Sequence, residues 1–232
     1  MHDHHSHITA RPWDFWLARG AIAVIAALQM FVVNYFSVGP KWLAPILELL
    51  LLLPLSIATA WTIGKARTAT HQHHFIELAK YRHAIRVAAI VLTALVTLTN
   101  FAALFELVRA LLAGKAGAAP LLLLDAINIW ITNVLAFALW FWNIDRGGPA
   151  LRGLHQTGGQ DFLFPQVTSH TPIGWTPGFV DYLFLAFTNA TAFSPTDTLP
   201  LTQRAKLLMM AQAAVSLLVV TLVAARAVNI LA

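Results

Sequence analysis

The chain has 232 residues, of which 58% are hydrophobic and 11% are charged. A soluble domain of this length needs more charged surface than this, whereas lipid covers apolar surface without that requirement. The composition therefore excludes a soluble protein and predicts an all-α, multi-pass integral membrane protein with about five transmembrane helices. The chain contains no cysteine, which excludes disulfides, thiolate metal sites and cysteine nucleophiles.

Lysine and arginine exceed the acidic residues by five. In a membrane protein such an excess reports topology and contact with anionic lipid rather than nucleic acid. We therefore expect the lipid bilayer as the main partner and no nucleic-acid partner. The expected location is the bacterial inner (plasma) membrane.

The first half of the chain is predicted to begin with a polar, histidine-rich tail at residues 1–12. Residues 13–112 then supply three apolar runs, each with the roughly 20 residues that a spanning helix needs. These three helices are expected over residues 13–36, 42–63 and 84–112, with a basic, histidine-rich loop at 64–83 before the third.

The second half, residues 113–232, is predicted to contain a helix over 121–142, a long loop from 143 to 178, a short apolar helix over 179–193 and a last helix over 203–231. The short helix has only fifteen residues, too few to cross a bilayer. We expect it to enter the membrane and turn back. Irregular backbone is tolerated at that depth only where protein buries it or where it lines water, which implies dense neighbouring helices or an oligomer.

Residues 179–228 read FVDYLFLAFTNATAFSPTDTLPLTQRAKLLMMAQAAVSLLVVTLVAARAV. This segment resembles the pore module of potassium channels, in which a short pore helix leads into a filter, an Asp, a turn and an inner helix. The resemblance implies that Asp197 takes the place of the filter's last residue, with Pro200 and Thr202 in the turn after it. It also implies a homo-oligomer, a tetramer by analogy, and a monovalent cation as the conducted species.

The segment aligned with the filter has no glycine. A potassium filter points its backbone carbonyls at the ion, which needs residues that adopt positive φ, the role of glycine. Pro195 has φ fixed near −65° and cannot adopt it. We therefore expect a non-standard filter, formed by Thr191, Ala192, Phe193, Ser194, Pro195, Thr196 and Asp197. A second role for the polar residues here is to cap the turn and the start of the last helix.

Three strings further resemble a group of uncharacterised bacterial membrane proteins, a resemblance that implies no activity. They are Asp145 to Pro149 (DRGGP), Asp161 to Gln166 (DFLFPQ) and Phe193 to Thr198 (FSPTDT).

The distribution of Lys and Arg and the resemblance to a potassium-channel pore predict opposite orientations for the loop at 143–202. The stretch 64–86 holds five Lys and Arg, whereas the turns at 37–41 and 109–119 hold one and two. The positive-inside rule therefore places 64–86 and, after five crossings, 143–202 in the cytoplasm. A potassium-channel pore loop faces outward. Both alternatives stay open at this point.

Two acidic residues, Glu48 and Asp125, fall within predicted spans. An ionisable group at membrane depth is a candidate for proton or ion handling, because burying it costs much free energy. Pairing or a position near the interface would also tolerate them. Glu106 and Arg109 are three residues apart on one helix and predict a simple ion pair.

The spacing of the histidines in the two histidine-rich stretches does not by itself supply a complete set of metal ligands. We therefore expect no metal site there and no cofactor. The chain has no phosphate-binding glycine loop, HExxH motif or nucleophile elbow, and we expect it not to be an enzyme. Two hypotheses remain. The first is an ion-channel-like protein, and the second is a non-conducting accessory or structural membrane protein that binds a partner complex.

Overall fold

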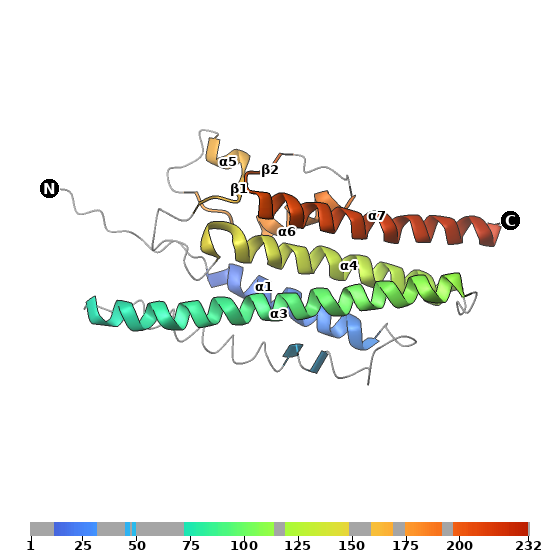
Figure 1. Ribbon diagram of the computed structural model, residues 1–232, viewed down its shortest axis with the longest axis horizontal. Helices are drawn as coiled ribbons and strands as arrows, with labels where there is room; N and C mark the ends of the chain where they lie inside the picture. The colour runs from blue at the N-terminus through green and yellow to red at the C-terminus, as the bar shows by residue number, and fades with distance from the viewer. Residues whose placement is uncertain are drawn as a thin grey trace.

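The computed structural model describes residues 12–31, 45–46, 48–49, 72–113, 119–148, 159–168, 175–191 and 197–231. Long helices run side by side along one direction, and short elements gather near one end of them (Figure 1). Three of the described helices are long and apolar enough to cross a membrane: His83–Leu112, Leu121–Gly147 and Gln203–Ala225. The prediction of a mostly helical membrane protein is confirmed to this extent.

Four helices form the body of the structure: α1 (Pro12–Phe31), α3 (Gln72–Leu112), α4 (Ala119–Ile144) and α7 (Gln203–Leu231). The predicted bounds of α7 are confirmed, and α4 extends two residues beyond its predicted bounds at each end. The predicted span at 84–112 agrees with the apolar span His83–Leu112, whereas α3 itself begins twelve residues before the predicted start, at Gln72. The polar residues before that span are good helix formers, and a helix continues beyond the lipid wherever its propensity allows.

Most of the second predicted helix, at 42–63, lies outside the described residues. Residues 45–46 and 48–49 of it are helical. The tail at 1–11, the loop at 64–71 and residues 32–36 at the end of the first predicted helix also lie outside them.

Helix α4 is central and contacts α1, α3, α6 and α7. Aromatic side chains near its end form much of the core, because they bury large apolar areas in edge-to-face contacts. The Phe141 ring lies 5.1 Å from that of Phe162, and the Trp142 ring lies 5.5 Å from Phe179 and 5.6 Å from Phe15. These contacts join α1, α4 and the short elements into one core.

Helices α3 and α4 are also joined by hydrogen bonds between side chains. The indole Nε1 of Trp140 donates to Thr97 Oγ1 at 2.8 Å, and Asn143 Nδ2 donates to Thr93 Oγ1 at 3.3 Å. Between apolar spans such contacts hold helices together, because hydrophobic burial gives no net gain in lipid.

The short elements are η1 (Asp145–Gly147), β1 (Phe162–Leu163), α5 (Pro165–Thr168), α6 (Phe179–Thr191) and β2 (Leu199–Pro200). Strands β1 and β2 pair antiparallel, with Phe162 opposite Pro200 and Leu163 opposite Leu199. The all-α prediction contained no strand. Two-residue strands carry no detectable periodicity, so the sequence could not have indicated them.

The short elements lie at the end of the structure where α4 finishes and α7 begins, except that α6 runs from there along α4 and α7 (Figure 1). We call this end of the structure the Asp145 end. The start of α1 is also there, because Asp14 contacts Phe179, and so is the first half of α3, because Thr93 contacts Asn143. Residues Leu112 and Ala119, which end α3 and begin α4, lie at the opposite end.

Candidate functional site

The candidate site is α6 together with the parts of α1, α4 and α7 that hold it. Helix α6 begins at Phe179, whose backbone N–H donates to Asp14 Oδ1 of α1 at 3.1 Å. Asp181 Oδ2 accepts from Gly178 N at 2.7 Å. Free N–H groups at a helix start need such acceptors, and a carboxylate also interacts favourably with the helix dipole there. The start of α6 is thus attached to α1.

Gly178 allows this close approach, and its replacement gives a testable prediction. A Cβ added at Gly178 would lie 2.7 Å from Asp14 Oδ1, so Gly178→Ala must displace that carboxylate. Because the cap on Phe179 N is then lost, we expect the free energy of unfolding in detergent micelles to fall by about 1 kcal/mol.

Gly20→Ala is the matched control, since a Cβ at Gly20 would have nothing within 4 Å. Alanine is the better helix former, so this change should leave stability unchanged or raise it by up to about 1 kcal/mol. Equal losses from the two variants would contradict the proposed cap.

The first turns of α6 pack against the end of α4 through their buried face. Tyr182 is fully buried, and its hydroxyl donates to Asp145 Oδ2 at 2.5 Å. The opposite face of α6 carries apolar side chains that are about half exposed, although the Phe187 ring also contacts Trp130 of α4: Val180, Phe184 and Phe187. One face of α6 therefore belongs to the core, and the other is free to contact lipid or another chain.

The end of α6 is held to α7 by amide groups. Asn189 Nδ2 donates to Gln212 Oε1 at 2.8 Å and to the Met209 carbonyl at 3.0 Å. Gln212 Nε2 donates to the Ala186 carbonyl at 2.7 Å. Next to them Asn133 Nδ2 of α4 donates to Ser216 Oγ at 3.0 Å. These bonds connect α4, α6 and α7 about halfway along the helices.

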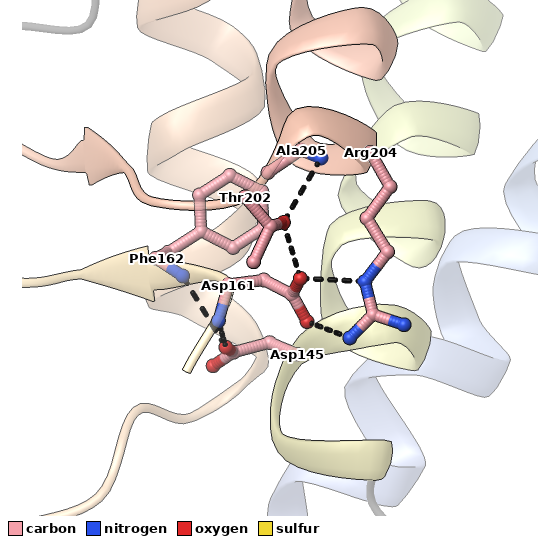
Figure 2. Close-up of polar contacts among 6 residues, drawn as sticks. All are labelled: Asp145, Asp161, Phe162, Thr202, Arg204 and Ala205. Atoms are coloured by element: carbon pink, nitrogen blue, oxygen red, sulfur yellow. Dashed lines mark hydrogen bonds and ion pairs between the residues drawn. The ribbon is translucent and has the colours of Figure 1, made fainter. Parts of the chain in front are cut away.

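Two buried carboxylates connect the ends of α4 and α7 with strand β1 (Figure 2). Asp145 and Asp161 are each 0% exposed. Asp145 Oδ1 accepts from the backbone N–H groups of Asp161 at 2.8 Å and Phe162 at 3.4 Å. Its other oxygen accepts from Tyr182, so both oxygens of Asp145 are in use.

Asp161 is paired with the first turn of α7. Arg204 donates through Nε to Oδ1 and through Nη2 to Oδ2, both at 2.6 Å, and Thr202 Oγ1 donates to Oδ1 at 2.5 Å (Figure 2). This two-pronged geometry is the strongest arrangement for an arginine and a carboxylate. Thr202 also accepts from Ala205 N at 3.3 Å and so caps α7. We name Asp145, Asp161, Thr202, Arg204 and Tyr182 the carboxylate joint.

The backbone turns sharply after α4. Arg146 has φ of 52°, and Gly147 and Gly148 have φ of 77° and 83°. A Cβ at Gly148 would lie 2.6 Å from the Asn143 carbonyl oxygen. Both this close contact and the positive φ therefore require glycine at position 148. Arg146 Nε lies 3.7 Å from Asp145 Oδ2 and adds a positive charge beside that carboxylate.

Of the predicted filter residues, the structure describes two. Thr191 is the last residue of α6, is exposed, and its hydroxyl donates to the Phe187 carbonyl at 2.9 Å. Asp197 is exposed in a bend before β2. Ala192, Phe193, Ser194, Pro195 and Thr196 lie outside the described residues.

The structure describes both predicted intramembrane acids. Glu48 is fully buried and contacts Gln29 of α1, whereas Asp125 is half-buried on the first half of α4. The predicted ion pair on α3 is confirmed, with Arg109 Nη1 3.5 Å from Glu106 Oε1.

Sequence reasoning did not single out the carboxylate joint. Asp145 and Asp161 appeared only inside strings that resemble other proteins, and Arg204 was not considered. A usable signal was present, because Asp145 directly follows an apolar span that ends in Trp140, Phe141 and Trp142. An acid at such a boundary needs a partner from elsewhere in the chain.

Comparison with known proteins finds no matching family model, no matching curated protein and no matching solved structure.

Proposed function

We propose that the chain is an ion-channel-like integral membrane protein with five transmembrane helices, in which α6 enters the membrane and the segment 191–197 lines the conducting path. In this proposal several copies assemble around that path. The conducted species is a monovalent cation, and Asp197 supplies negative charge at the mouth.

The path of α6 is the observation that carries the proposal. Its first turns contact Asp145 at one end of α4, and Asn189 contacts Gln212, nine residues into the 23-residue span Gln203–Ala225. By Leu199 the chain is back at the Asp145 end, paired with Leu163. Leu199 follows Thr191 by eight positions, and extended backbone of that length covers at most about 25 Å. That reach suffices to return from mid-span, as a re-entrant element must.

Burial supports an assembly of several copies. The inner face of α6 is filled, since Ala186 is 0% and Asn189 is 3% exposed. A path along α6 therefore lies on its outer face, and closing it requires a second copy. Exposed apolar residues on α6 and on α7 offer contact surface: Phe184, Phe187, Leu207 and Met210.

Flux through liposomes tests the proposal. We expect the purified oligomer to carry K⁺ or Na⁺, and Asp197→Asn to reduce the flux about tenfold, because acidic rings concentrate cations at a pore mouth. Glu106→Gln, in an ion pair on α3, is the control and should leave flux unchanged. A monomer, or an oligomer without flux for any ion or pH, removes the proposal.

Single-cysteine labelling fixes the orientation, because the chain has no cysteine of its own. Leu199→Cys reports the Asp145 end and Leu112→Cys the opposite end, and both side chains are exposed. The two should be labelled from opposite sides of the membrane. Labelling of Leu199→Cys from the periplasm supports the potassium-channel orientation, and labelling only from the cytoplasm removes it.

A second candidate is a non-conducting accessory protein that keeps the same arrangement for contact with a partner. The absence of glycine between Thr191 and Asp197 favours it, since a carbonyl-lined filter needs positive φ. Stoichiometric copurification with a larger complex, together with no flux, would select this candidate.

A further inference from the structure

A carboxyl group lies midway along the helices on the side of the structure formed by α1 and α3. Glu48 is 0% exposed, and its Oε1 accepts from Gln29 Nε2 of α1 at 3.2 Å. The same nitrogen lies 3.3 Å from Thr99 Oγ1 of α3. Thr99 is sixteen residues from His83 and thirteen from Leu112, the two ends of the longest apolar span. Glu48 is therefore held near the middle of that span.

The bonding of Glu48 differs from that of the buried amides Asn189 and Gln212. The side-chain amides of Asn189 and Gln212 bond each other and backbone carbonyls. Glu48 Oε2, in contrast, is buried and has no hydrogen-bond partner among the residues that the structure describes. Buried polar atoms are nearly always bonded, so an exception of this kind calls for an explanation.

No cation among the described residues compensates Glu48. On α1, Asp14 is bonded to Phe179, and Arg19 is ten residues from Gln29, about 15 Å along the helix. On α3, Glu106 is seven residues from Thr99, about 10 Å, and is paired with Arg109. The remaining titratable groups on α3 with described side chains are farther toward the Asp145 end: His83 and Arg86.

A buried carboxylate without a cation costs several kcal/mol, whereas the neutral acid does not carry this penalty. Among the described residues no group of three His, Cys, Asp or Glu side chains is placed to hold a metal ion, so Glu48 has no further carboxylates beside it as a divalent-cation site would need. We propose that Glu48 is a proton-binding site at mid-depth, where Oε2 takes up one proton to form the neutral acid and releases it to form the carboxylate. Its described contacts are with α1 and α3 and include no residue of α6.

An apolar carbodiimide, dicyclohexylcarbodiimide, tests the proposal on the full chain in membranes. It reacts only with the protonated acid: the carboxyl oxygen adds to the central carbon, the proton goes to a nitrogen, and no group leaves. We expect one adduct on the peptide that contains Glu48, located by mass spectrometry. Its yield should fall by at least about tenfold as the medium is raised from about pH 5 to about pH 9.

The control is Glu106→Gln, which should leave the adduct on the Glu48 peptide unchanged, whereas Glu48→Gln should abolish it. No adduct on folded wild-type protein at any pH overturns the proposal. A yield that does not vary with pH also overturns it, because the proton is then not exchangeable. Protection by Na⁺ at constant pH assigns the site to a metal cation and overturns it as well.

Infrared spectroscopy detects the protonated Glu48 carboxyl group directly, without a chemical adduct. The wild-type protein should show a carboxylic-acid C=O band that shifts in D₂O and disappears as the pH rises. Glu48→Gln, an uncharged residue of the same shape, should fold and lack the band. If Glu48→Gln fails to fold, the wild-type band and the mapped adduct decide alone, and the absence of both rejects the proton site.

Discussion

Arg204→Ala should lower the free energy of unfolding by about 2 to 3 kcal/mol. The change removes both arginine bonds to Asp161, which is 0% exposed, and leaves a buried carboxylate with Thr202 and no cation. Breaking a buried pair from one side costs about 3–5 kcal/mol. The expected loss is smaller because the Arg204 side chain is 55% exposed, so solvent screens part of the charge. Unfolding in mixed detergent micelles measures it.

The matched control is Arg109→Ala, which removes a different arginine–carboxylate pair, with 3.5 Å between Arg109 Nη1 and Glu106 Oε1, at the opposite end. That pair is solvent-exposed on the arginine side, so its loss should cost about 1 kcal/mol or less. The double change Asp161→Asn with Arg204→Met should recover much of the stability, because it removes the charge and its partner together. Similar losses for Arg204→Ala and Arg109→Ala would show that the carboxylate joint is not buried as described.

Asp145→Ala should destabilise the protein by about 3 kcal/mol or more. The carboxylate accepts from Asp161 N, Phe162 N and the Tyr182 hydroxyl, and its removal leaves these donors buried without an acceptor. Each such donor costs about 1–3 kcal/mol. Because Tyr182 lies on α6, the first half of α6 should also become accessible, which amide hydrogen exchange at residues 179–185 would detect.

Asp145→Asn keeps one carbonyl oxygen for the backbone donors and should fall between wild type and Asp145→Ala. Asp197→Ala is the control at the same end, since Asp197 is exposed and such changes remain within about 0.5 kcal/mol. Faster exchange in α6 after Asp197→Ala but not after Asp145→Ala would reverse our assignment of what holds α6.

The parts of the fold that follow from one-dimensional patterns could be predicted from the sequence. Apolar runs of sufficient length identified the three helices that can cross a membrane, because lipid permits little else. The helix predicted over 203–231 has the same bounds as α7, and the fifteen-residue run at 179–193 contains the thirteen residues of α6. The pair formed by Glu106 and Arg109 followed from helical spacing alone.

The carboxylate joint could not be predicted, because its partners are far apart in the sequence. Arg204 is 43 residues from Asp161, and Tyr182 is 37 residues from Asp145. No local spacing rule relates such residues, and each acid alone reads as a loop residue. The start of α3 at Gln72 could not be predicted for a different reason. Hydropathy identifies the residues that lipid can surround, and it does not identify where a helix begins or ends.

The bond from Asp14 to Phe179 also bears on how the chain assembles during synthesis. Its partners are 165 residues apart, so α1 is synthesised long before the backbone that its aspartate caps. Until residue 179 has been made, Asp14 has no Phe179 N–H to accept from, and α1 cannot take its final place beside α6. An early helix of the chain is therefore completed by a segment that is synthesised late.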